Sequence, residues 1–244
     1  MDQAQTLRQV TARYQGQLNF EGLEAQSLTI MTTQGALDLA QDLSIRLAQV
    51  YQKYYKPTLF IADRSELPRG IHNVRKFSLQ QMVKEFIDVN DLNSWGIKGV
   101  IFYSGTTIDE VKKSLFDKNR KLLVFLGPKD RDTIEIAQRL RSVEKHFGIK
   151  KADIVSLGFE SDKLSRAQFV ELYESVNRFT PMNLTWRGSL KFHEKISDSI
   201  ARWKFLVNLK SGYGSEPELY QLLVQIGLLP VQNAQNTLPR IEAR

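Results

Sequence analysis

The chain alternates between short, continuously apolar runs and longer segments in which apolar residues recur at every third or fourth position. The apolar runs lie at residues 28–33, 58–62, 99–103, 122–126 and 152–157. Runs of this length, bounded by turn residues, are typical of buried β-strands. A strand that is apolar on both faces needs cover on both. We therefore expect a mostly parallel sheet of about five strands between two layers of helices, a three-layer α/β/α fold.

The segments between these runs have the spacing of amphipathic helices. Helices are predicted over residues 35–55, from Ser78, from Thr107, around 136–147 and over 165–179. Thr107 with Glu110, and Ser165 with Gln168, have the spacing of capping boxes, in which each side chain bonds the other residue's backbone amide. Residues 1–15 form a further predicted helix, and residues 18–20 a possible extra edge strand.

The alternation of strand and helix stops near Pro181. Residues 189–210 have the pattern of one long helix, and residues 216–226 that of a shorter one closed by Gly227. The sequence therefore predicts an α/β domain over residues 1–180, followed by a helical C-terminal extension over residues 181–244.

Composition restricts the chemistry that the chain can carry. Its 244 residues are 42% hydrophobic and 25% charged, as in globular proteins, and none is cysteine, which excludes disulfides and thiolate metal sites. The three histidines lie on separate segments, and no Gly-x-Ser-x-Gly elbow is present. Because no catalytic motif is complete, we predict no metal and no cofactor, and the balance is against an enzyme. The sequence has neither a signal-peptide pattern nor an apolar run long enough to span a membrane, so we expect a cytoplasmic protein.

The charge is positive and unevenly distributed. Lys plus Arg is 34 against 27 for Asp plus Glu, which gives a net charge of +7. Residues 64–150 carry +6 of this excess. A basic protein attracts anions, and nucleic acid is a common anionic partner. The alternative is that this charge only keeps the protein soluble.

One loop has the features of an anion site. Ligands of parallel α/β sheets bind beyond the carboxyl ends of the strands, where Ser104, Gly105, Thr106 and Thr107 follow a predicted strand and begin a predicted helix. Free backbone amides and the positive end of the helix dipole favour a phosphate there. The alternative is that Thr107 only caps its own helix.

Basic residues beside aromatic ones indicate a candidate nucleic-acid surface, since cations follow a phosphate backbone and aromatic rings stack on bases. Its predicted members are Trp186, Arg187, Lys191 and Arg202, together with a second cluster at Arg69, Arg75 and Lys76. A third basic cluster comprises Lys112, Lys113, Lys118, Arg120 and Lys121. The alternative is a solvated, partly paired helix face. The sequence leaves open whether these clusters share one face.

The segment over residues 18–36 contains a Gly-Leu pair, a short turn, a strand and a glycine. On Gly22, Leu23, Leu28, Thr29, Ile30 and Gly35 it resembles the opening of RecA-like ATPase domains, which implies a P-loop ATPase-like core. A phosphate loop also needs Gly-Lys followed by Ser or Thr, and here the chain has Gly35, Ala36, Leu37 and Asp38. No acidic residue ends the run over residues 99–103. The resemblance therefore implies a core that has lost its catalytic lysine and hydrolysis.

Three functions fit these observations. The leading one is a non-catalytic accessory or regulatory protein that binds nucleic acid or another anionic partner. The second is an enzyme or sensor for a phosphorylated small molecule at the sheet edge. The third is a protein-interaction module that docks through its C-terminal helices.

Overall fold

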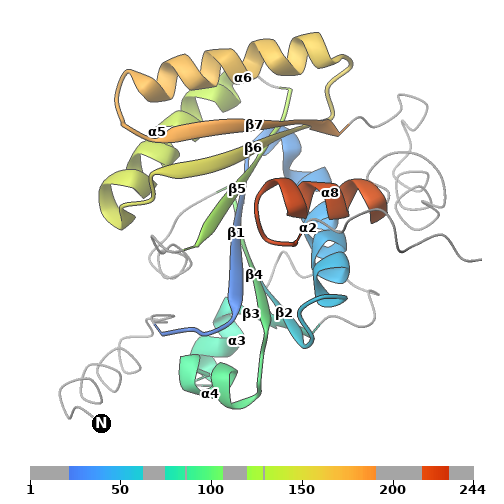
Figure 1. Cartoon of the computed structure of the whole chain (residues 1–244). Helices are drawn as coiled ribbons and strands as arrows, with labels where there is room; N and C mark the ends of the chain where they lie inside the picture. Colours follow the sequence, from blue (N-terminus) through green and yellow to red (C-terminus); the bar gives the residue numbers. More distant parts are fainter. Residues whose placement is uncertain are drawn as a thin grey trace, which may run out of the picture.

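The computed structural model describes residues 22–62, 75–85, 87–106, 120–128, 130–190 and 216–230. They form one parallel sheet of seven strands in the order β3-β2-β4-β1-β5-β6-β7 (Figure 1). The strands are β1 (Gln26–Thr32), β2 (Thr58–Ala62), β3 (Arg75–Ser78), β4 (Gly99–Gly105), β5 (Lys121–Leu126), β6 (Lys151–Leu157) and β7 (Asn183–Leu190). The helices are η1 (Gln34–Ala36), α2 (Leu37–Gln52), α3 (Leu79–Lys84), α4 (Val89–Ser94), α5 (Asp130–Phe147), α6 (Asp162–Asn177) and α8 (Glu216–Gln225).

Helices cover both faces of the sheet. Helices α3, α4, α5 and α6 pack on one face, and α2 and α8 pack on the other (Figure 1). The predicted three-layer α/β/α fold and its parallel sheet are confirmed, and all five predicted strands are present. The sheet has seven strands, however, and not about five.

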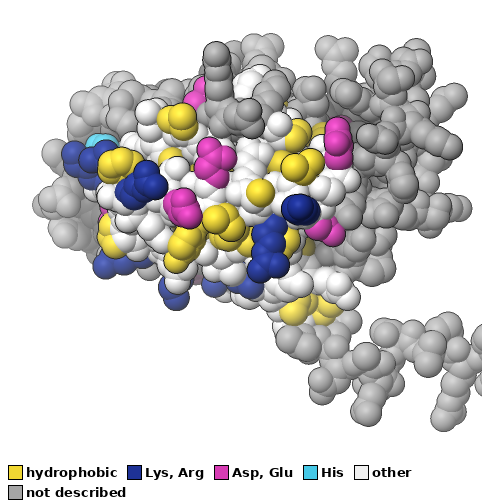
Figure 2. Space-filling model, turned by 90° about the horizontal axis from the view of Figure 1, so that it is seen from above, with side chains coloured by type: hydrophobic (Ala, Val, Ile, Leu, Met, Phe, Trp, Pro, Cys, Tyr) yellow, Lys and Arg dark blue, Asp and Glu magenta, His cyan; other side chains and the backbone are white. Residues whose placement is uncertain are grey.

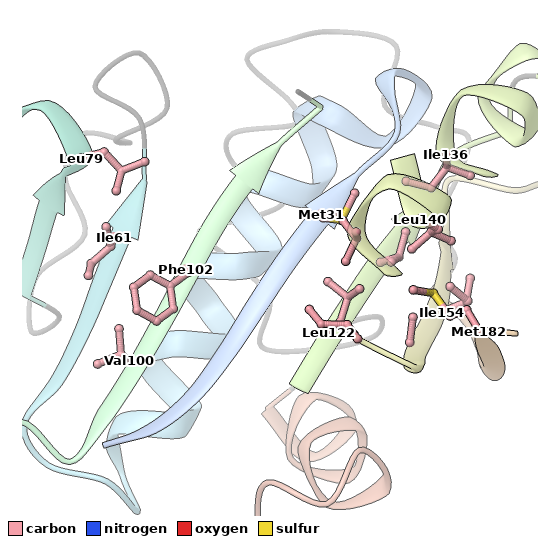
Figure 3. Close-up of a cluster of buried hydrophobic side chains, with 14 of the residues drawn as sticks. Met31, Ile61, Leu79, Val100, Phe102, Leu122, Ile136, Leu140, Ile154 and Met182 are labelled. Carbon is pink, nitrogen blue, oxygen red and sulfur yellow. The ribbon is translucent and has the colours of Figure 1, made fainter. Parts of the chain in front are cut away.

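The core follows from the alternation of side chains along each strand. In β4, Val100 and Phe102 face the α5 layer, whereas Ile101 and Tyr103 face the α2 layer, and all four are fully buried. Figure 3 shows the first layer, in which Ile136 and Leu140 of α5 lie over the sheet beside Met31, Leu122 and Ile154. Burial on both faces explains why the central strands are continuously apolar.

Both missed strands lie at the edges of the sheet. In β3 only Ser78 is buried, and in β7 only Leu184. The helix expected from Ser189 is wrong at its start, because Ser189 and Leu190 end β7. The rest of that predicted helix lies outside the described residues. The domain boundary at residue 181 stays a prediction. The structure adds that β7, beyond this boundary, pairs with β6 and that α8 packs on the sheet.

Helix ends agree with the sequence in part. Gly148 follows α5 in the left-handed region, with φ of +66°, as expected of the glycine that ends a helix. At α6 the predicted cap was wrong, since Ser161 precedes the helix and its Oγ accepts from the backbone amide of Leu164 at 3.3 Å. Ser165 lies one turn inside the helix and is buried. Helix α4, capped reciprocally by Asp88 and Asp91, was not predicted.

Within the described part of the chain, no helix combines the length and apolar character needed to span a membrane. The predicted helices at residues 1–15 and from Thr107 lie outside the described residues.

Candidate functional site

The turn after β1, where a P-loop ATPase would hold its phosphate loop, is short and closed. It comprises Thr33 and the single 3-10 turn η1, and α2 begins directly after it. The amide of Thr33 donates to the carbonyl of Phe125 at 3.0 Å, and the amide of Gly127 donates to Oγ1 of Thr33 at 2.8 Å. These bonds tie the turn to the end of β5.

The backbones at this point are in direct contact. A Cβ atom on Gly127 would lie 2.3 Å from the carbonyl carbon of Gly35 and 2.4 Å from the amide nitrogen of Ala36. Only glycine permits such an approach. The space beside the turn is therefore filled by the chain after β5.

A cation also lies at the carboxyl ends of these strands, but it is hydrogen-bonded to protein. Nη1 of Arg139, on α5, donates to the carbonyl of Thr32 at 3.0 Å and to the carbonyl of Thr106. The guanidinium thereby joins the carboxyl ends of β1 and β4. Arginine suits this position because its planar group presents several donors at fixed angles.

The predicted anion site lies at the same edge and stays a prediction. Ser104 is a fully buried residue of β4, and the strand continues through Gly105, which has φ of +64°. Thr106 is half-buried and accepts from Arg139 through its carbonyl. Thr107 lies outside the described residues.

At the amino ends of the strands, opposite the turn after β1, the sheet carries a hollow of about 560 Å³, which we call the amino-end hollow. It lies at the amino ends of β5, β6 and β7 and is also lined by Ile226, just after α8. Five of its lining residues are cationic and one is acidic. The cations are Arg120, Lys121, Lys150, Lys151 and Arg187, and the carboxylate is Asp153.

The local fold explains how these cations meet. Parallel pairing aligns the amino ends of β5 and β6, so Lys121 and Lys151 come together although 30 positions separate them in sequence. The turn at Gly148 directs Lys150 to the same edge, and the amide of Asn183 donates to the carbonyl of Lys150 at 2.8 Å. The side chain of Arg120 is buried, with its guanidinium carbon 4.4 Å from the centre of the Phe102 ring.

Arg187 is positioned by an irregularity in the edge strand. Ile154 pairs with Trp186 and Ser156 with Ser189, so the register shifts by one residue at Arg187 and Gly188. Bulges of this kind re-aim side chains. Nε of Arg187 donates to Oδ1 of Asp153 at 2.7 Å, and the side chains are 28% and 15% exposed. The ion pair therefore lies in the wall of the hollow.

The structure separates the predicted nucleic-acid residues. Arg75 and Lys76 lie on β3, and Trp186 and Arg187 lie on β7, the two outermost strands of the sheet. Six strand spacings of about 4.8 Å give roughly 29 Å between them. Burial lowers the pKa of Lys76 below its ordinary value. Arg69, Lys191 and Arg202 lie outside the described residues.

Trp186 packs against protein. Its ring lies 6.3 Å from that of Phe169 on α6, nearly parallel to it, and its Nε1 donates to Oγ of Ser156 at 3.4 Å. The guanidinium of Arg166 lies 6.0 Å from the same ring. These contacts give the half-buried indole a structural role, so its proposed stacking on a base stays a prediction.

Sequence reasoning missed Lys150, Lys151 and Asp153. The Lys150–Lys151 pair before a strand was the available signal. It was passed over because the rule for parallel sheets directs attention to the carboxyl ends of strands, and these residues lie at the amino ends.

The described residues contain no cluster of three or more histidine or acidic side chains that could hold a metal ion. The face around α6 carries exposed apolar side chains, but Figure 2 shows them scattered among Lys, Arg, Asp and Glu. This face therefore presents no continuous apolar patch.

Comparison with known proteins identifies the fold. MinD from Aquifex aeolicus superposes with a TM-score of 0.55 at 10% identity, covering 85% of this chain and all of MinD. A ParA family ATPase from Chlorobium tepidum gives 0.54 at 13% identity, covering 82% and 98%. McdA from Cyanothece, in a variant bound to ATP, gives 0.53 at 12% identity, covering 86% and 100%.

No family model and no curated protein matches the sequence. At these identities the structural likeness shows the fold alone, an α/β/α fold like that of MinD and of the ParA family ATPase. The ATPase-like core implied by the resemblance at residues 18–36 is confirmed as a fold, and the loss of its catalytic lysine stays a prediction.

Proposed function

We propose that this chain is a non-catalytic accessory or regulatory protein that keeps the fold of a P-loop ATPase and acts by binding an anionic partner. The closed turn after β1 supports the first half of this proposal. Between β1 and α2 the chain has only four residues, and Gly127 packs on their backbone. A phosphate loop needs a longer, glycine-rich segment whose amides surround the phosphates, and a lysine to neutralise them.

Charge supports the second half. The chain carries +7, and the amino-end hollow is lined by five cationic residues. Arg139 adds a cation at the carboxyl ends of the strands, where it donates to the carbonyls of Thr32 and Thr106. The proposed binding surface is therefore at the amino ends of the strands.

Nucleotide turnover tests the first half directly. Purified protein with magnesium and ATP or GTP should release phosphate no faster than a blank. Turnover that survives purification to homogeneity, and that disappears in a Thr33→Val variant with an unchanged melting temperature, would contradict the proposal. The Thr33→Val change alters the turn and keeps the size of the side chain.

Titration with nucleic acid tests the anionic partner. A single-stranded oligonucleotide should bind at low salt, and the logarithm of its binding constant should fall linearly with the logarithm of the salt concentration. Binding with no salt slope, or none at low salt, would remove nucleic acid from the candidates. The proposal would then depend on smaller anions.

A further inference from the structure

We infer that the amino-end hollow binds a compact ligand that carries several adjacent phosphate groups. This inference rests on the proposed binding of an anionic partner and names the chemistry and place of that partner. Its basis is the convergence of five cations, carried by β5, β6 and β7 and by the residues just before β5 and β6, on one hollow of ligand size.

The electrostatics of the hollow favour several negative charges. Its lining residues carry a net charge of +4. The described residues include no acidic partner for Lys121, Lys150 or Lys151, and the ion pair at Arg187 uses only its Nε. Helices α5 and α8 both have their carboxyl ends beside the hollow, next to Gly148 and Ile226, and each contributes at most about half a negative charge. A net charge of about +3 therefore remains at the hollow.

Size and shape favour a compact ligand over a long polymer. A hollow of about 560 Å³ lies within the roughly 300–1,000 Å³ range of small-molecule sites. A nucleic acid would need cations along a continuous track, and the described cations of β3 lie at the far edge of the sheet. Arg187 is held in place by its ion pair before any ligand arrives, which lowers the entropy cost of binding.

Polar neighbours add directional donors. Asn183 and Thr185 of β7 line the same hollow. The Nζ atom of Lys121 lies close to Gly227, in the turn after α8, and a methyl group added to Gly227 would be 3.6 Å from it. The hollow therefore offers both fixed cations and neutral donors, as phosphate groups require.

Calorimetric titration of the full chain with tripolyphosphate and with orthophosphate tests the inference. Tripolyphosphate should bind at least tenfold more tightly, because it contacts several cations at once. The double variant Lys121→Gln/Lys151→Gln should lose about tenfold in affinity. A matched double variant, Lys145→Gln/Lys163→Gln, removes two exposed lysines outside the hollow and should change affinity by less than twofold.

Asp153→Asn supplies a test of opposite sign. Asparagine keeps an oxygen that accepts from Nε of Arg187 but removes the negative charge. Tripolyphosphate affinity should then rise about fourfold at low salt, the effect of one charge some 5 Å away in a water-like dielectric. Equal losses in the two lysine pairs, or weaker binding by Asp153→Asn, would overturn the inference.

The same titrations separate this inference from the proposed function. If tripolyphosphate does not bind while an oligonucleotide does, and Lys121→Gln/Lys151→Gln weakens the oligonucleotide, the partner is nucleic acid and the compact ligand is wrong. If the protein turns over ATP, the proposed function fails whatever the hollow binds.

Discussion

Tyr51 shows the cost of burying one polar atom. Its ring is fully buried under the sheet, and its hydroxyl has no partner among the described residues. Burial, assisted by the neighbouring Tyr55, raises the pKa of Tyr51 above its ordinary value. Tyr55 contrasts with it, because its hydroxyl donates to the carbonyl of Leu228 at 3.0 Å. The two tyrosines therefore differ in one respect: the hydroxyl of Tyr55 has a hydrogen-bond partner, and that of Tyr51 has none among the described residues.

Tyr51→Phe should raise the free energy of unfolding by about 1 kcal/mol at pH 7, because it removes a buried donor without a partner. The gain should grow above about pH 10, where the unfolded tyrosine ionises and the folded one does not, because this loss of stability from Tyr51 occurs in the wild type and is absent from the variant. Urea denaturation at both pH values measures this. Tyr55→Phe should instead cost about 1 kcal/mol, and a loss of the same size in Tyr51→Phe would show an unseen partner.

Gly127 controls the closed turn by its lack of a side chain. In Gly127→Ala the new methyl group would overlap the backbone of Gly35 and Ala36, and backbone cannot swing aside as a flexible side chain can. We expect a loss of about 3 kcal/mol or more in the free energy of unfolding. Gln34→Ala, at an exposed residue of the same turn, should stay within about 0.5 kcal/mol. A harmless Gly127→Ala would show that the turn has room to open.

At the scale of elements, hydrophobic pattern determined what could be predicted. The central strands β1, β2, β4, β5 and β6 were found because burial on both faces leaves a continuous apolar run. The edge strands β3 and β7 lack such a run, because only one residue of each is buried. No local pattern distinguishes such a strand from a loop, since its strand state depends on the neighbour it pairs with.

Near the start of α6 two serines are candidates for the N-cap of the helix. Ser161 and Ser165 are four positions apart, and only Ser161 caps. Ser161→Ala should cost about 1 kcal/mol, because the amide of Leu164 loses its acceptor. In Ser165→Ala the lost bond is only to the carbonyl of Asp162 within the same helix, so the cost should be smaller. Thermal or urea unfolding of the two variants measures the difference, and a larger loss in Ser165→Ala would contradict the capping assignment.

At the scale of the whole molecule, the candidate site was the part least accessible to sequence. The sequence places Lys121 in a basic cluster but gives no sign that it meets Lys151 and Asp153. Their meeting depends on the pairing of β5 with β6, and the bulge that positions Arg187 depends on the pairing of β6 with β7. Sequence also leaves open whether the basic clusters share one face, and the sheet places Arg75 and Arg187 on its two outermost strands.

This separation leads to a prediction that compares the β3 edge of the sheet with the amino-end hollow. If the amino-end hollow is the principal anion site, Arg75→Gln/Lys76→Gln at the β3 edge should change tripolyphosphate affinity by less than twofold. The strands of the hollow lie four to six strand spacings from β3, about 19 to 29 Å, which is well beyond the screening length of roughly 8 Å at physiological salt. The variant removes as much charge as Lys121→Gln/Lys151→Gln, so net charge alone would affect both equally. Calorimetry at physiological salt compares them. Equal losses would mean that the chain attracts anions through its overall charge, and the hollow would lose its special role.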